Sequence, residues 1–466
     1  MAQKVFVFGI GGTGLRVMKS IIMLLSSGFD SKGYTIVPVL IDPHQDLDER
    51  TQLTSLIEEY IDIYRRTTGA NVGNANTWPH LDGFFRTEVK TLEELDQQQN
   101  PINDSMADQR IFSDYLELGN LPSDDINQYI VQTLFSQNNL DSSLSVGFKG
   151  NPNVGTVVLG DMIEGADWFA AFERHCERGD RVFIISSIFG GTGASGYPLL
   201  EKKIRNNTNP NVKSAVMGAV TVFPYFALKD PTATGSSIDS ANFMTKTKSA
   251  LAYYEKNVVS DFLYYIGDTS LNATYDNDES KQDNKANFIE LVAATALFDF
   301  LSKAKDNTTQ YLSRAIKSDV EVLDLNTLGD GYKDVIKAVA DLNFLQEIIN
   351  FLRNETSFPL VKTRLLDEQF YRDESFKKLN DFINNRYSTW FDQLSNNKRA
   401  FAPINTDYYS QRIKGVSLKA KSLAYYILRM IKESNNAKDE NNNIQIRHLL
   451  NFAYKAINFY TNKIYN

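Results

Sequence analysis

The stretch Phe189 to Gly196 reads FGGTGASG and directly follows the apolar run Val182-Phe183-Ile184-Ile185. Four of its eight residues are glycine, a composition that costs more backbone entropy than a simple turn requires. Thr192 and Ser195 add hydroxyl groups to the loop. A helix that opens behind such a loop directs free N–H groups toward an anion. We therefore predict that residues 190–196 bind phosphate.

Two further glycine-bearing turns accompany this loop. GIGGTG occupies Gly9 to Gly14 behind the apolar run Val5 to Phe8, and GFKGNPNVG occupies Gly147 to Gly155. Neither GIGGTG nor FGGTGASG has the GK[ST] ending of a P-loop, so backbone N–H groups and hydroxyls would hold the phosphates without a lysine. Because ligands of open α/β sheets bind at the carboxyl ends of the strands, we expect all these turns to meet at one edge.

The order of apolar runs and amphipathic segments predicts an α/β fold with a doubly wound, mostly parallel sheet and helices on both faces. The run at 34–41, for example, is nearly all apolar, which is typical of a parallel strand covered on both sides. We assign the sheet with its phosphate-binding loops to one domain of residues 1–45 and 141–325. Residues 46–140 form a helical insertion, and residues 326–466 a helical C-terminal domain.

Composition narrows the class of protein. With 466 residues, 42% hydrophobic and 23% charged, the chain is typical of a globular protein. Its single cysteine, Cys176, excludes an internal disulfide, and neither a signal peptide nor a membrane-length apolar run is visible, so we expect a cytoplasmic protein. Of the net charge of −8, residues 376–466 carry +9 and the preceding part −17. The acidic part makes nucleic acid an unlikely ligand there, and the basic block can dock on an acidic surface.

FGGTGASG closely resembles the GGGTGSG signature of the tubulin/FtsZ superfamily, and the chain looks like a divergent bacterial member. Gly9 to Gly14 looks like the first nucleotide loop of that family. Asp42-Pro43-His44-Gln45 looks like the second loop, and Gly147 to Gly155 is similar to the third, where the bacterial proteins have NPEVG. The resemblance extends from residue 4 to about residue 300.

The resemblance implies a tubulin-like GTPase domain that binds GTP or GDP with Mg²⁺. The metal would be held by phosphate oxygens and water, with no direct protein ligand and with Asp42 acting through water. Asp268 falls where the family has an Asn that reads guanine, and Glu290 lies near the start of the helix that packs against the base. The implied nucleotide-binding residues are Gly11, Gly12, Thr13, Gly14, Asp42, Gly150, Asn151, Gly190, Gly191, Thr192, Gly193, Ala194, Ser195, Gly196, Asp268 and Glu290.

Hydrolysis in polymerising tubulins needs an acidic loop that enters the site of a neighbouring subunit. The nearest equivalents here are Asp330 and Asp334, although acids just before a helix are also common helix caps. The resemblance thus implies a slow GTPase whose site is completed by a second subunit, with self-association or a protein partner. The sheet domain that follows the core helix in the family is not visible, and helices take its place.

Two other functions stay open at this point. GIGGTG fits the dinucleotide fingerprint G-x-G-x-x-G loosely, and Asp42 ends the second strand where a ribose-binding acid would lie, so an NAD(P)-binding protein is the first alternative. The second is a degenerate tubulin-like fold that serves interaction and does not hydrolyse nucleotide.

Overall fold

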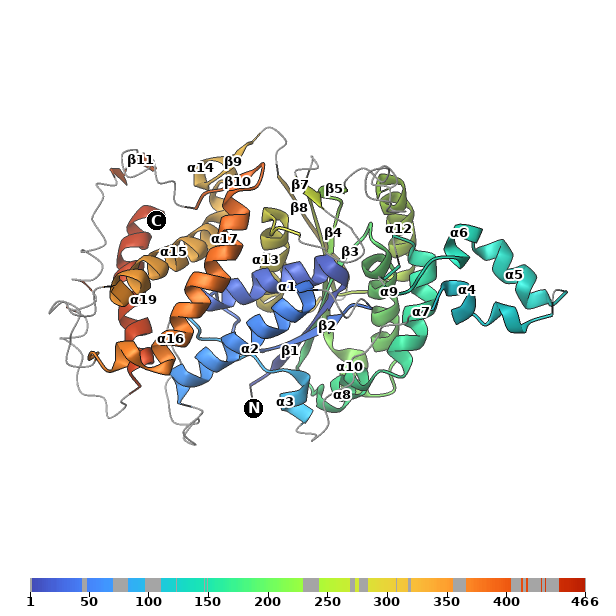
Figure 1. Cartoon of the computed structure of the whole chain (residues 1–466), viewed down its shortest axis with the longest axis horizontal. Helices are drawn as coiled ribbons and strands as arrows, with labels where there is room; N and C mark the ends of the chain where they lie inside the picture. Colours follow the sequence, from blue (N-terminus) through green and yellow to red (C-terminus); the bar gives the residue numbers. More distant parts are fainter. Residues whose placement is uncertain are drawn as a thin grey trace.

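A computed structural model gives the conformation of most of the chain (Figure 1). The described residues are 2–43, 48–69, 83–96, 110–122, 124–145, 147–148, 150–228, 243–268, 273–275, 284–306, 308–316, 320–354, 366–403 and 444–465, with short pieces at 412–413, 416–417, 429 and 432.

A six-stranded, entirely parallel sheet forms the centre of the molecule, as predicted from the sequence. Its order is β2-β1-β3-β4-β6-β8, with β1 Lys4–Ile10, β2 Thr35–Ile41, β3 Arg181–Ser187, β4 Val216–Val222, β6 Phe262–Asp268 and β8 Gln310–Ile316. Parallel strands need crossover connections, and the helices between them supply these.

Side chains of the central strands alternate between two separate apolar cores. Val5 and Val7 of β1 join one core, whereas Phe6 and Phe8 join the other, as the period of two in a strand requires. The first core contains α1 Gly11–Ser26, α2 Asp48–Thr68 and α13 Phe288–Ser302. The second contains α7 Pro152–Glu164, α8 Asp167–His175, α9 Gly191–Arg205 and α10 Pro210–Ser214, beside which α12 Phe243–Asn257 packs. Helices therefore cover both faces of the sheet.

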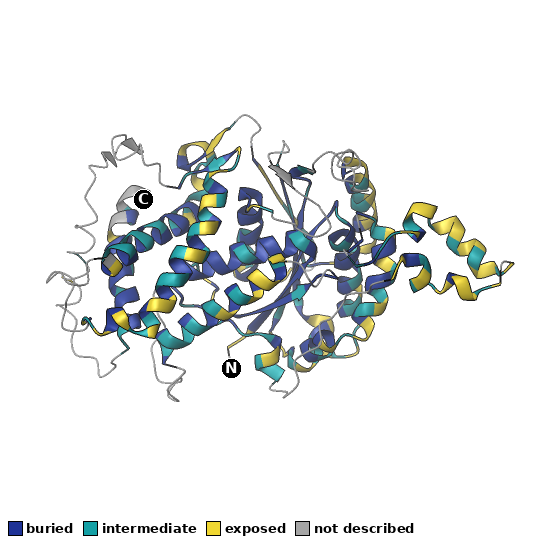
Figure 2. Ribbon diagram, viewed as in Figure 1, coloured by how far each residue is buried: buried dark blue, intermediate teal, exposed yellow. Residues whose placement is uncertain are grey.

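The segment predicted as a helical insertion divides into a part inside the core and a part outside it. The long helix α2 packs along α1 in the first core. Farther along, α4 Phe112–Tyr115, α5 Ile126–Leu134 and α6 Gln137–Leu140 form an arm that projects from the α7 and α9 side (Figure 1). In Figure 2 the buried residues lie mainly in the central sheet and the helices around it, whereas α5 has no buried residue.

The chain beyond residue 326 is largely helical where it is described. It contains α15 Lys333–Asn354, α16 Glu374–Asp381, a π-helical segment Phe382–Tyr387, α17 Ser388–Ser395 and α19 Gln445–Tyr465. These helices share the first core with α1 and α2. The domain boundaries stay predictions. Within the described part of the chain, no helix is long and apolar enough to span a membrane.

Candidate functional site

Two helices begin side by side at the carboxyl edge of the sheet. β1 leads directly into α1 at Gly11, and β3 leads through a short turn into α9 at Gly191. These strands are paired up to Gly9 and Ile185. A Cβ atom built on Gly11 would lie 3.3 Å from Thr192 Cβ and 3.4 Å from the Gly193 nitrogen. The two glycine loops therefore touch each other, as the sequence predicts.

The third glycine turn joins the same place. A Cβ atom on Gly191 would lie 2.9 Å from Phe148 Cβ and 3.1 Å from the Gly150 nitrogen. One on Gly155 would overlap Ser195 Oγ. The Gly150 carbonyl accepts a hydrogen bond of 2.6 Å from Lys246 Nζ of α12. Three helix starts, those of α1, α9 and α7, are thus within contact of one another.

None of these three helices has a side-chain cap from its N-cap residue. These N-cap residues, all of them described, are Ile10, Gly190 and Asn151, and each has extended backbone without a side-chain hydrogen bond to the first turn. The first turn of a helix presents free N–H groups and the positive end of the helix dipole. Three such ends at one point are chemically suited to an anion with several charges.

Two positions show why glycine is needed here. Gly11 has φ of +70°, a left-handed conformation that other residues rarely adopt. At Gly193 a Cβ atom would lie 2.8 Å from both the nitrogen and the oxygen of Ser187. Because these are backbone atoms of β3, they cannot move aside cheaply. The geometry of these two loops therefore requires glycine at positions 11 and 193, as the sequence pattern has it.

The predicted loop residues differ in what they offer a ligand. Gly12, Gly190, Thr192 and Asn151 are partly exposed. The remaining loop residues named from the sequence are buried: Gly11, Thr13, Gly14, Gly150, Gly191, Gly193, Ala194, Ser195 and Gly196.

Several of the buried loop residues are bonded within the protein. The Ser195 hydroxyl donates to the Gly191 carbonyl at 2.8 Å, and the Ala194 carbonyl accepts from Tyr254. Backbone N–H groups are consequently the main donors at this site.

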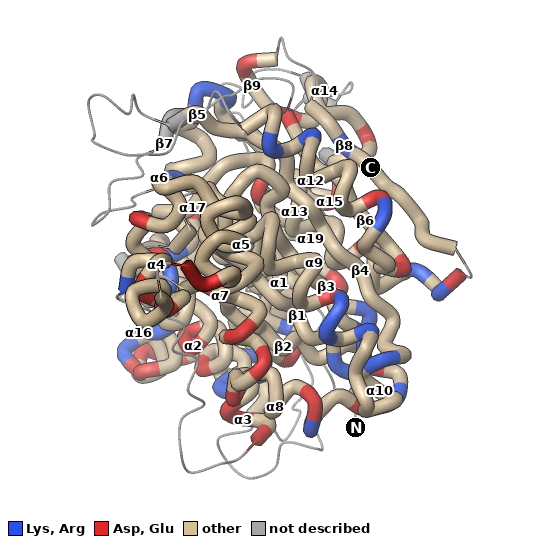
Figure 3. The backbone as a smooth tube through the Cα atoms, turned by 90° about the vertical axis from the view of Figure 1, so that its right-hand side faces the viewer, with Lys and Arg blue, Asp and Glu red and all other residues tan. Residues whose placement is uncertain are grey.

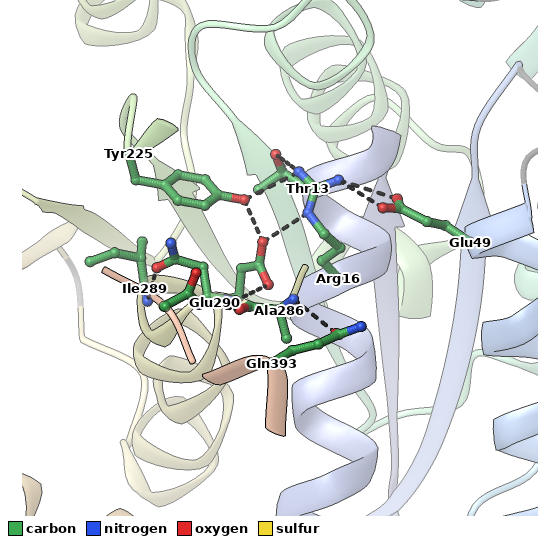
Figure 4. Close-up of polar contacts among 10 residues, drawn as sticks. Thr13, Arg16, Glu49, Tyr225, Ala286, Ile289, Glu290 and Gln393 are labelled. Carbon is green, nitrogen blue, oxygen red and sulfur yellow. Dashed lines mark hydrogen bonds and ion pairs between the residues drawn. The ribbon is translucent and has the colours of Figure 1, made fainter. Parts of the chain in front are cut away.

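Behind the α1 start, Arg16 holds a buried cluster of polar groups (Figure 4). Its Nε donates to Glu290 Oε1 at 2.8 Å, and its Nη1 donates to Glu49 Oε2 at 3.2 Å. Its Nη2 donates to both Thr13 Oγ1 and Tyr225 Oη at 3.2 Å. Arg16, Glu49 and Tyr225 were not recognised in the sequence. The only local signal in the sequence is that Arg16 follows the last glycine of the first loop, Gly14, by two residues.

Glu290 is fully buried and is bonded through both oxygens. Oε1 accepts from Arg16 and, at 2.6 Å, from the Tyr225 hydroxyl, while Oε2 accepts from the Asn287 N–H at 2.9 Å. The Asn287 side chain in turn accepts from Ile289 N–H, which completes a capping box at the start of α13. Glu290 therefore has a clear structural role in addition to its place beside the site.

A pocket of about 390 Å³ opens next to this cluster. It is lined by Leu15, Arg16, Lys19, Asp48, Glu49, Gln52, Leu53, Asn284, Ala286, Glu290 and Gln393. A Cβ on Gly12 would lie 3.2 Å from Arg16 Nη1 and 3.7 Å from Glu49 Oε2. The pocket thus begins where the α1 loop ends, and it offers both cationic and anionic groups.

Burial raises the pKa of Glu49 to about 7. Arg16 lowers this pKa, whereas the nearby charges of Glu290 and Asp42 raise it. Asp42 follows β2 directly, is 6% exposed and is close enough to Glu49 to affect its charge. It therefore lies on the same side of the sheet as the α1 loop. His44 and Gln45, the rest of the predicted second loop, fall outside the described residues.

The other predicted site residues lie apart from the glycine loops. Asp268 ends β6, which β4 separates from β3, and both of its oxygens accept from Arg399 Nη1 at 2.8 Å. Asp330 and Asp334 are exposed on the connection before α15 and in its first turn. Asp334 lines a separate groove of about 700 Å³ along β8, α13 and α15, and none of the described residues of the glycine loops lines that groove. No cluster of three or more His, Cys, Asp or Glu side chains suited to a metal occurs among the described residues.

No protein-family model and no curated protein matches this chain. Among solved structures, it is similar to CetZ from Methanosaeta thermophila strain DSM 6194, at 14% identity and a TM-score of 0.26. The match covers 57% of this chain and 46% of that one, and it carries no argument about function. Fold and site together define an α/β protein whose all-parallel sheet has three uncapped helix starts at its carboxyl edge.

Proposed function

We propose that this chain is a tubulin-like guanine-nucleotide-binding protein, a slow GTPase whose nucleotide state controls self-association or partner binding. The observation that carries the proposal is the meeting of three uncapped, glycine-rich helix starts at one point. Their combined positive ends suit a polyphosphate better than a single carboxylate. The phosphates would lie against the N–H groups of residues 11–14 and 190–196.

The pocket behind Gly12 supports a place for the nucleoside. It is continuous with the α1 loop and borders the start of α13, where the resemblance to tubulins places the base. Its amide side chains, Asn284 and Gln393, and its carboxylate Glu290 can match the donors and acceptors of guanine. Asp268 is held by Arg399, so its contact with a base requires that ion pair to open.

Mg²⁺ in this proposal is bound by phosphate oxygens and water, with Asp42 in contact through water. Such a metal needs no cage of protein ligands. Two results would support this arrangement: GTP binding that requires Mg²⁺, and a weaker dependence of that binding on Mg²⁺ in Asp42→Asn.

Thermal denaturation with and without nucleotide tests the binding step. A ligand at 100 times its Kd adds about 2.7 kcal/mol to the free energy of unfolding. GTP or GDP with Mg²⁺ should raise the melting temperature, and NADH should not. The position of Asp42 at the end of β2 is the observation that favours NAD(P), and protection by NADH alone would establish that alternative. If neither the guanine nucleotides nor NADH raise the melting temperature, the remaining alternative is a protein that serves interaction and binds no nucleotide.

Thr192→Asp is the matched variant for this test. Thr192 is partly exposed in the first turn of α9, where a carboxylate stabilises the helix and repels phosphate. The variant should be folded and no less stable than the natural chain, yet show no shift with GTP. Thr192→Asn, which adds no charge, should keep most of the shift. An undiminished GTP-induced shift in Thr192→Asp would show that the phosphates do not bind at this loop.

Hydrolysis is proposed to require a second molecule that supplies Asp330 or Asp334. Both acids are exposed, as a group acting on a neighbour must be. The rate should rise faster than in proportion to protein concentration, and Asp330→Ala or Asp334→Ala should lose turnover while keeping the GTP-induced stabilisation. A rate proportional to concentration, with both variants active, would instead indicate a site complete within one chain.

A further inference from the structure

Helix α5 of the arm presents an apolar face that nothing in the described structure covers. Ile126, Tyr129, Ile130 and Leu134 are 69%, 62%, 49% and 65% exposed. Spacings of three and four residues place them on one side of the helix. The other side rests on the arm itself through Phe135, whose ring packs edge-on against Phe112 at 4.9 Å. This apolar face is unusual for a surface helix, where single exposed apolar residues are the norm.

Few polar contacts attach the arm to the body of the molecule. The Tyr115 hydroxyl donates to Asp161 of α7 at 2.8 Å, and Asn153 donates to Asn139 at 3.2 Å. Figure 3 looks at the molecule from the side on which the arm projects, with α5 toward the viewer and α7, α9 and α12 around or beyond it. Helix α5 thus lies beyond the surface from which the arm rises, and the four side chains of its apolar face are exposed.

That same surface contains an apolar groove of about 340 Å³ between α7, α9 and α12. Its lining includes Pro198, Leu199, Ala250, Tyr253 and Tyr254. Its α12 wall runs from Thr245 to Tyr254, about 15 Å at 1.5 Å per residue, and α5, from Ile126 to Leu134, spans about 13.5 Å on the same count. A cavity of about 150 Å³ holds one benzene-sized group, so this groove has room for about two such side chains.

Charge also matches the arm to the groove. Residues 111–145 contain five acidic residues and no Lys or Arg. The three helices that wall the groove contain six Lys or Arg and four Asp or Glu, a net charge of +2. Opposite charge favours docking of an arm on this wall. The like charge of two arms disfavours contact between them.

We propose that α5 of one chain docks in the α7–α9–α12 groove of a second copy, and that the exchange is reciprocal. Because arm and groove lie on the same side of the molecule, a twofold axis lets each chain fill the groove of the other and closes the assembly as a dimer. The inference specifies the self-association half of the proposed function. It adds a route to nucleotide control, since Ser195 and Asn153 line the groove and belong to the α9 and α7 starts.

Sedimentation of the full chain over a range of concentrations tests the contact. Ile130→Asp should weaken self-association at least tenfold, and Gln132→Asp, which adds the same charge at an exposed position of α5 outside the apolar face, should not. Ser249→Arg, at an exposed position in the groove, should weaken it as Ile130→Asp does. Melting curves would verify that each variant is folded.

Mixing the two defective variants distinguishes arm-to-groove docking from other modes. A mixture of Ile130→Asp and Ser249→Arg contains one intact arm and one intact groove, so hetero-dimers should form where neither variant dimerises alone. A natural chain that is monomeric at every concentration, or a mixture that fails to associate, would overturn the proposal. Ile130→Asp should still show a GTP-induced thermal shift, so failure of the contact and failure of nucleotide binding give different results.

Discussion

Two kinds of helix start lie close together in this molecule, and they are stabilised in opposite ways. At the start of α13, Asn287 and Glu290 form a complete capping box and bond to the backbone N–H groups. At the starts of α1, α9 and α7 the N-cap residues Ile10, Gly190 and Asn151 make no such bond. The contrast separates a helix start that serves the fold from three that are suited to a ligand. Arg16, which extends from α1 to Glu290, joins the two kinds.

Removing Arg16 should have the largest effect on stability. In Arg16→Ala the fully buried Glu290 carboxylate loses its cationic partner, a change that typically costs about 3–5 kcal/mol. Urea denaturation would measure the loss. Adding Glu290→Gln to Arg16→Ala should recover part of it, because the unpaired buried charge is then gone. If the double variant is no more stable than Arg16→Ala, the ion pair is not what joins α1 to α13.

Glu49 should make stability depend on pH. Its pKa is raised from 4.5 to about 7 in the fold, so the proton stabilises the folded state. That contribution is fully present below about pH 4.5 and is lost as pH rises through 7, a change of up to about 3 kcal/mol. Glu49→Gln lacks this loss and should therefore be more stable than the natural chain at pH 8.

The same charge should affect nucleotide binding. Phosphates at the α1 start would raise the Glu49 pKa further, so binding takes up a proton and affinity should fall from pH 6 to pH 8. Titration calorimetry at the two pH values would measure this. An equal fall in Glu49→Gln would assign the pH dependence to another group.

Gly193→Ala should distort the uncapped start of α9. The added methyl would lie 2.8 Å from backbone atoms of Ser187, and overpacking of this kind costs about 1–3 kcal/mol. The GTP-induced shift in melting temperature should also be lost. Gly160→Ala is the matched control, since nothing lies within 4 Å of its added Cβ in the interior of α7. Similar losses in the two variants would contradict a special role for the loop.

Asn287→Ala should have the smallest effect and sharpen the contrast most directly. Loss of a helix cap costs about 1 kcal/mol, and Asn287→Ser, which retains a capping oxygen, should cost less. Both variants should keep the full GTP-induced shift, because the α13 cap serves the fold. Loss of that shift in Asn287→Ala would show that the cap also holds Glu290 in place for the ligand.

The buried strands and glycine turns could be predicted because their signals are local. An apolar run followed by a glycine loop specifies a parallel strand and a helix start, and the convergence of Gly11 with Gly193 follows from the sheet. The strand β8 was missed, since it is an edge strand with four exposed residues out of seven and no continuous apolar pattern. Its exposure removes the periodicity on which such a prediction depends.

The polar contacts could not be predicted because they join distant parts of the sequence. Glu290 is 274 positions from Arg16, and Arg399 is 131 positions from Asp268. Asp268 was interpreted as a base-reading residue from the resemblance to tubulins, a comparison in which its ion-pair partner Arg399 is invisible. The helical character of residues beyond 326 was likewise readable, whereas their sharing of one core with α1 and α2 depends on tertiary packing.

The position of α19 has a consequence for synthesis of the chain. Its Tyr454 packs edge-on against Phe84 at 5.7 Å, across 370 positions of sequence, and α19 covers part of α2. Ribosomes add about 5–20 residues per second, so roughly 20 to 70 s separate the appearance of Phe84 from that of its partner. During this interval the part of α2 that α19 covers in the folded protein is uncovered on the nascent chain. The first core therefore closes late in translation, and a chaperone has that time to bind it.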